Sequence, residues 1–174
     1  MTITPPLADV PIRSADQLTD RWRALLDPPE FGARSLWLSW FGSDARTLPV
    51  VIPVDEIPLV PQPAMLMGLR QMHDSLVEEQ LDGDGHLAMA LCRPGGPRVR
   101  GDDELWIDAL RSTLDDGQID GSWSLHLGAG GQVTPLVEAP SWVWSHWRRL
   151  GGCSPDRGGA SESVHREREV TVSD

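Results

Sequence analysis

The residues best suited to chemistry stand in one short segment, residues 93–101, with the sequence Arg-Pro-Gly-Gly-Pro-Arg-Val-Arg-Gly. This segment joins a short apolar run, which we expect to form a buried strand, to the start of an expected helix. In open α/β sheets ligands bind at such a junction, and free backbone N–H groups at a helix start attract anions. Arginine side chains add donors suited to phosphate or carboxylate. We therefore predict a small-anion site with the candidate residues Arg93, Gly95, Gly96, Arg98, Arg100 and Asp103.

A second interpretation of the same segment is structural. It holds three of the four arginines between Asp74 and Asp120, a stretch that also contains twelve acidic residues. The arginines could pair with these acids and hold a rigid loop in place. The sequence leaves both interpretations open.

The residue spacing gives little support to a metal site. A zinc site usually needs three or four closely spaced ligands, and no HxH or HxxxH pair occurs among His73, His86, His126, His146 and His165. Asp82 and Asp84 resemble the start of a calcium loop. The sixth and twelfth loop positions, however, are Leu87 and Arg93, where glycine and glutamate are needed. The sequence therefore predicts no metal and no cofactor.

The cysteines and the missing residue types argue against nucleophilic catalysis. Cys92 and Cys153 lie far apart and form neither a CxxC clip nor a disulfide framework. We interpret Cys92 as a small buried side chain, and the alternative is a thiol whose pKa is lowered by the neighbouring Arg93. The chain has no Gly-x-Ser-x-Gly elbow, no Lys and no Tyr.

Three segments together carry a family resemblance over about residues 34–137. They are Leu91-Cys92-Arg93-Pro94-Gly95-Gly96 with Asp103 after it, the turn Trp-Phe-Gly-Ser-Asp-Ala-Arg-Thr-Leu at residues 40–48, and Leu125-His126-Leu127 followed by glycines. They resemble the RadC-type branch of the JAB/MPN metalloprotease-like domains. The layout is also similar to that of short actinobacterial proteins. The resemblance implies the order strand, strand, helix, strand, helix, strand, strand, and it adds His126 to the candidate residues of the loop.

The departures from that family bear on function. In the family two histidines and an aspartate hold zinc; here the histidine positions are Leu91 and Arg93, and only Asp103 keeps a ligand. The family's serine position falls on Arg100 or Gly101. Leucine cannot bind a metal, and a guanidinium group repels a dication. We expect a non-catalytic JAB-like interaction or regulatory module. The alternative is an enzyme of another type that acts on a small anionic substrate through Arg93 and Asp103.

The hydrophobic pattern predicts an α/β (α+β) fold, a mixed sheet flanked by helices with a tendency to three layers. In chain order we predict a helix opened by Ser14 and ended by Pro28 and Pro29, strands 35–41 and 48–54, a helix 64–81, a strand 86–92, a helix 104–114, and strands 122–127 and 132–137. Strand 86–92 is continuously apolar, which is typical of burial on both faces. Pro49 and Pro53 indicate an edge strand or a bulge. Asp102 or Asp103 is expected to cap the third helix.

We expect one domain over residues 14–150, a flexible N-terminus over residues 1–13 and a disordered tail over residues 151–174. Three of the eight tryptophans, Trp142, Trp144 and Trp147, stand just before that tail. They could pack on the sheet as part of the core, or remain exposed as contacts for a protein partner.

The charge of the chain limits its partners. Its 174 residues include 15 basic and 26 acidic side chains, which give a net charge of -11 and a pI near 4.7. Such a charge repels phosphate backbones, so nucleic acid is not an expected partner. No apolar run approaches membrane-spanning length and no signal-peptide pattern is present, so we expect a cytoplasmic location without membrane contact. A protein partner, a second copy of the chain and a small anion remain as expected ligands.

Overall fold

The computed structural model describes residues 10–81, 85–115, 122–141 and 143–144. The elements are α1 (Ala15–Leu25), β1 (Ser35–Gly42), β2 (Thr47–Asp55), α2 (Pro63–Gln80), β3 (Gly85–Cys92), α3 (Gly101–Leu114), β4 (Ser122–Ala129) and β5 (Gln132–Val137). The predicted mixed α/β class and the predicted order of these elements are confirmed.

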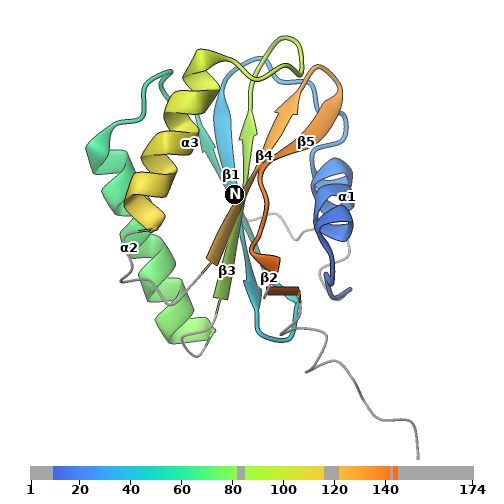
Figure 1. Cartoon of the computed structure of the whole chain (residues 1–174), viewed down its shortest axis with the longest axis vertical. Coiled ribbons are helices and arrows are strands. Elements are labelled where there is room, and N and C mark those ends of the chain that lie inside the picture. Colours follow the sequence, from blue (N-terminus) through green and yellow to red (C-terminus); the bar gives the residue numbers. More distant parts are fainter. Residues whose placement is uncertain (1–9, 82–84, 116–121, 142, 145–174) are drawn as a thin grey trace, which may run out of the picture.

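The five strands form one mixed sheet in the order β2-β1-β3-β4-β5. Only β3 and β4 run parallel, and α3 is the crossover between them. Their carboxyl ends therefore meet at the same edge of the sheet, at the top of Figure 1, where α3 begins. This is the edge at which the sequence predicts a ligand site.

Helices cover both faces of the sheet, with α2 and α3 on one side and α1 on the other (Figure 1). Side chains of β3 alternate between the two layers. Leu87, Met89 and Leu91 join the core under α2 and α3, whereas Ala88, Ala90 and Cys92 join the core under α1. Every residue of β3 is buried, which confirms the prediction of burial on both faces.

The edge position of β2 is also confirmed. It pairs with β1 alone, and the register shifts between Ser39 and Phe41. Pro49 and Pro53 have no backbone N–H to donate, so they are best tolerated at an edge or beside an irregularity.

The chain packs against the domain before Ser14. The side chain of Ile12 is buried, and its N–H donates to the Ala45 carbonyl at 2.8 Å. Ser14 caps α1 as predicted, accepting from the Gln17 N–H at 3.2 Å. The Gln17 side chain in turn accepts from the Arg13 N–H at 2.7 Å. The prediction of a flexible N-terminus over residues 1–13 is therefore wrong at Ile12 and Arg13, which these contacts hold in place. Residues 1–9 and the predicted tail over residues 151–174 lie outside the described residues.

The start of α3 differs from the prediction. The helix begins at Gly101 with Arg100 as N-cap, so the prediction that Asp102 or Asp103 caps it is wrong. Asp103 is the third helical residue, and its carboxylate accepts from the Arg100 N–H at 2.9 Å. A carboxylate at the third helical position accepts a hydrogen bond from the backbone N–H of the N-cap residue. Asp103 thus stabilises the start of α3 from within its first turn.

The described residues include no helix that is both long and apolar enough to cross a membrane.

Two glycines give a stability test of this fold. Gly68 lies exposed within α2, and a Cβ added there would meet no atom within 4 Å. Gly68→Ala should raise the free energy of unfolding by about 0.5–1 kcal/mol through helix propensity. Gly130 has a φ of 57°, and a Cβ there would lie 2.9 Å from Pro97 Cδ. Gly130→Ala should lower the same quantity by about 1–2 kcal/mol. Urea unfolding of the two variants should show opposite signs, and a shared sign would contradict the backbone described here.

Candidate functional site

Three chain segments converge at the carboxyl edge of β3 and β4. The N–H of Arg93, which follows β3, donates to the Gly128 carbonyl of β4 at 3.1 Å. The turn between β4 and β5 lies against the 93–100 loop, since a Cβ on Gly130 would come within 3.1 Å of the Gly95 carbonyl oxygen. The N–H of Gly131 donates to Pro29 at 3.3 Å. The predicted ligand loop is therefore packed against neighbouring backbone.

Arg93 is wholly engaged inside this edge. Its side chain is 1 % exposed. Nε and Nη2 donate to the Asp103 carboxylate at 2.8 and 2.7 Å. The remaining donors reach backbone carbonyls of Pro94 and Gly96 from Nη1, at 3.3 and 3.0 Å, and of Arg98 from Nη2, at 2.8 Å. A guanidinium group has five N–H donors, and each has an acceptor here.

Asp103 is the centre of the cluster, and its side chain is 0 % exposed. It accepts from Arg93, from the Arg100 N–H, and from Nη2 of Arg34 at 3.3 Å. Burial alone would raise the pKa of Asp103. The hydrogen bonds from Arg93 and the Arg100 N–H, with the charges of Arg93 and Arg34, outweigh it and lower that pKa. The carboxylate is ionised and held by cations.

Arg34, just before β1, is the member of this cluster that sequence reasoning missed. It pairs with both Asp102 and Asp103, and its side chain is buried. Nothing in its local sequence marks it, because its partners lie almost seventy residues away in α3. A buried arginine of this kind becomes visible only when the strand order is known.

The remaining arginines of the loop face solvent. Arg98 and Arg100 are both exposed. Gly95 has a φ of 92°, and the guanidinium group of Arg100 lies where a Cβ on Gly95 would stand; Gly96 is exposed. Arg93 thus pairs with an acid, as the structural interpretation of the loop predicts. Anion binding by Arg98 and Arg100 stays a prediction.

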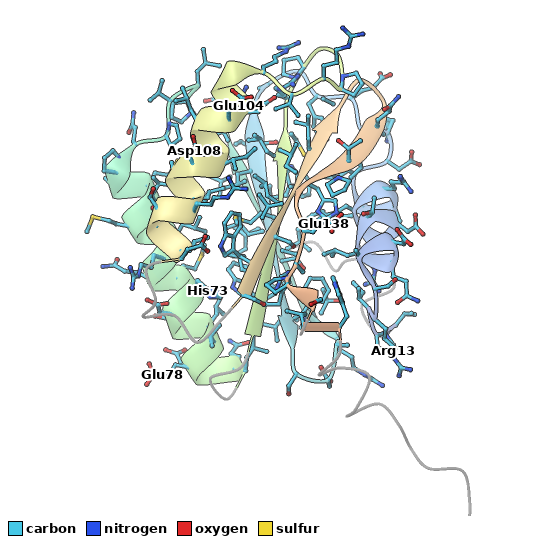
Figure 2. The ribbon with its side chains drawn as sticks, in the orientation of Figure 1. Arg13, His73, Glu78, Glu104, Asp108 and Glu138 are labelled. Atoms are coloured by element: carbon cyan, nitrogen blue, oxygen red, sulfur yellow. The ribbon has the colours of Figure 1, made fainter. Side chains whose placement is uncertain are left out.

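The buried histidines lie away from this cluster. His126 is on the α1 face of the sheet, where its Nε2 is 3.0 Å from Thr19 Oγ1. His86 lies between two β4 hydroxyls, with ring nitrogens 2.7 Å from Ser122 Oγ and 2.9 Å from Ser124 Oγ. Figure 2 shows His73 between α2 and the sheet, where its Nδ1 accepts from Trp40 at 3.1 Å. The structure does not bring His126 to the loop.

Burial keeps these ionisable groups neutral. It lowers the pKa of His86 to about 3, with smaller contributions from His73 and His126. It also lowers the pKa of His126 to about 4, and it raises the pKa of the Cys92 thiol to about 12. The interpretation of Cys92 as a small buried side chain is therefore confirmed. The alternative, a thiol activated by Arg93, is wrong, because Arg93 turns to the opposite face and pairs with Asp103.

The tryptophan segment is described only at its start. Val143 and Trp144 are buried in the core under α1, and the Trp144 ring lies 6.4 Å from the His86 ring, centroid to centroid. At Trp144 the core interpretation applies. Trp142 and Trp147 lie outside the described residues.

Known proteins offer no further assignment of this site. Comparison with protein-family models, with curated proteins and with solved structures finds no match. Within the part of the chain that the structure describes, no three His, Cys, Asp or Glu side chains are grouped to hold a metal ion. At the carboxyl edge, arginine side chains neutralise the charge of the buried Asp103 carboxylate.

Replacing Asp103 tests how much this cluster contributes to the stability of the fold. Asp103→Asn leaves two buried guanidinium groups with only Asp102 to balance them, so we expect a loss of about 3–5 kcal/mol of unfolding free energy. Asp108→Asn in the same helix is the matched control, because its side chain is 77 % exposed. It should change stability by about 0.5 kcal/mol or less. Denaturant unfolding measures both variants, and equal effects would contradict a structural role for Asp103.

The histidines predict a pH dependence of stability. An unfolded histidine has a pKa near 6.5, well above the folded values of about 3 and about 4 for His86 and His126. At pH values between the folded and unfolded pKa values, the unfolded chain binds more protons than the folded chain. The contribution of these histidines to the free energy of unfolding is therefore complete above pH 6.5 and is lost as the pH falls. At pH 5 we expect a loss of about 2 kcal/mol for each histidine.

Denaturant unfolding between pH 7 and pH 5 measures this dependence. In that range Asp103 stays ionised in both states, so the histidines dominate the slope. His86→Gln should reduce the slope by about one proton. A slope that is unchanged in this variant would show that His86 is not held neutral in the folded protein.

Proposed function

We propose that this chain is a non-catalytic binding domain, an interaction or regulatory module of JAB/MPN-like descent that has lost its metal ligands. The observation that carries the proposal is the buried pair of Arg93 and Asp103. By the resemblance, Asp103 stands at a zinc-ligand position and Arg93 at the position of a ligand histidine. In this chain the arginine supplies the positive charge that a metal would otherwise bring to the carboxylate.

The geometry of the pair supports this interpretation. A metal at Asp103 would need carboxylate lone pairs, and these already accept from Arg93, Arg34 and a backbone N–H. It would also stand beside two guanidinium groups, which repel a dication. Leu91, at the other histidine position, is fully buried in the core under α3. The observed order from β1 to β5 is the one that the resemblance implies.

Side chains outside the loop also support a non-catalytic role. General acid–base or nucleophilic catalysis needs a side chain that reaches the substrate and has a pKa near the working pH. His86, His126 and Cys92 are buried, and burial moves their pKa values away from neutrality. An enzyme built on Arg93 and Asp103 would need both groups to reach a substrate, and they face each other instead.

The proposal also includes the cellular location and the type of ligand. We place the domain in the cytoplasm, where the unpaired thiol of Cys92 stays reduced. The expected ligand is a protein rather than a nucleic acid, since the chain carries a net charge of -11.

Purification from the native host tests the proposal. The protein is isolated without chelators and analysed by elemental analysis and native mass spectrometry. We expect much less than one zinc or iron per chain, no retained small molecule, and a protein partner in stoichiometric amount. About one metal ion per chain, or a tightly bound small organic molecule in place of a protein, would overturn the proposed loss of catalytic function.

A further inference from the structure

Exposed apolar side chains gather where α2 and α3 begin. Leu59 and Val60 are 63 % and 61 % exposed in the connection that leads into α2. Met67 on α2 is 62 % exposed and Leu105 on α3 is 48 % exposed. We call these four residues the helix-start surface. Single exposed apolar residues are common, but a group of them on one face indicates a binding surface.

A hydrogen bond places the connection beside α3. Trp106 Nε1 donates to the Pro58 carbonyl at 3.0 Å. Leu59 and Val60 follow Pro58 directly, and Leu105 precedes Trp106. The indole ring of Trp106 is buried in the core that also contains Ile57 and Leu66. The connection and the first turns of α3 are therefore packed together, with their outer side chains in solvent.

Helical spacing places Met67 and Leu105 on the two sides of the groove between the helices. On α2, Met67, Arg70 and Asp74 follow one side at intervals of three and four residues. On α3, Leu105 and Thr113 follow one side at an interval of eight residues. Arg70 Nη1 lies 3.5 Å from the Thr113 carbonyl oxygen, so the Arg70 side of α2 reaches the last turn of α3. Figure 1 shows the two helices side by side on one face of the sheet.

The outer side of α2 next to Met67 has room for a helix. Ala64 and Gly68 are exposed and four residues apart, so they stand one turn above the other. A Cβ on Gly68 would meet no atom of this chain within 4 Å, so internal packing does not require the glycine. Small side chains on a helix allow a second helix to approach closely.

Acidic side chains predominate along the outer sides of α2 and α3, and the exposed Arg98 and Arg100 stand just before α3. Glu104 and Asp108 lie along the outer side of α3, and Glu78 lies near the end of α2 (Figure 2). Asp74 and Glu79 of α2 are exposed as well. The basic side chains of the two helices, Arg70 and Arg111, each lie within 4 Å of an acid, Asp74 and Asp108 respectively. An apolar surface with an acidic rim is complementary to an apolar surface with a basic rim.

The same charges disfavour other occupants. A second copy would bring the same acidic rim to the interface, and like charges repel. Anionic lipid and nucleic acid are repelled for the same reason.

We propose that the helix-start surface binds an amphipathic helix of a partner protein, with leucine-like side chains on one side and lysine or arginine on its flanks. This inference rests on the proposed binding function and names the chemistry of the partner. The apolar side of the partner helix covers Met67 and Leu105, and its basic flanks reach Glu104 and Asp108. Helix-in-groove recognition of this kind uses apolar anchors at intervals of three and four residues.

A synthetic helical peptide of leucine and lysine at that spacing is the probe, and the same peptide with glutamate in place of lysine is its control. The test variant of the full chain is Met67→Gln together with Leu105→Gln, which removes apolar surface without adding charge. The matched control is Val10→Gln, because Val10 is 50 % exposed and its carbonyl accepts from Arg21 of α1, on the opposite face of the sheet (Figure 1). Circular dichroism and thermal midpoints establish that all variants fold alike.

Calorimetry should show that the lysine peptide binds the wild-type chain and that the glutamate peptide does not. Affinity should fall about tenfold or more in the double variant, stay within about twofold in Val10→Gln, and weaken at high salt. Absence of binding, equal binding of both peptides, or equal loss in both variants would overturn the inference. A wild-type dimer that dissociates in the double variant would overturn it in favour of a second copy.

The native partner separates this inference from the proposed function. If the partner that co-purifies with the wild-type chain also co-purifies with the double variant, the choice of surface is wrong while the binding function stands. If a retained metal or small molecule takes the place of the partner, the proposed function itself fails.

Discussion

A buried carboxylate organises the carboxyl edge of the sheet. Asp103 has no access to water, and an ionised carboxylate in such a place needs cations and hydrogen-bond donors. Arg93 supplies them from the end of β3 and Arg34 from the residue before β1. Arg93 also binds three carbonyls of its own loop, so one ion pair sets the path from β3 into α3. The loop then supports the β4–β5 turn at Gly130. The charged groups of Arg93 and Asp103 therefore face each other inside this edge rather than solvent.

Much of the fold follows from local sequence features. A continuous apolar run predicts the central β3, and two prolines predict that β2 lies at an edge, because both patterns reflect burial and hydrogen bonding within one strand. The capping interaction of Ser14 and Gln17 is likewise encoded within four residues. The start of α3 was harder to predict. Asp103 has the residue type of an N-cap, but its burial against Arg93 places it in the third helical position instead.

The candidate site was less predictable, because its interactions join distant parts of the chain. The sequence brings Arg93 and Asp103 to one loop, yet it does not decide whether the arginine faces an acid or a ligand. Arg34 joins them through a strand order that no local pattern reveals. In β4 the alternating Ser122, Ser124 and His126 have the pattern of a solvent-facing side. They are buried, since α1 covers that face and His86 on β3 pairs with both serines.

The central claim is that Arg93 is a structural group sealed inside the domain. Nitrogen-15 NMR of the arginine Nε–H groups tests it most directly, with exposed Arg98 as the internal reference. The claim predicts a slowly exchanging Nε–H signal for Arg93 at neutral pH, unmoved by millimolar phosphate or citrate, and a fast-exchanging signal for Arg98. An Arg93 signal that exchanges as fast as that of Arg98, or that shifts when either anion is added, would contradict it.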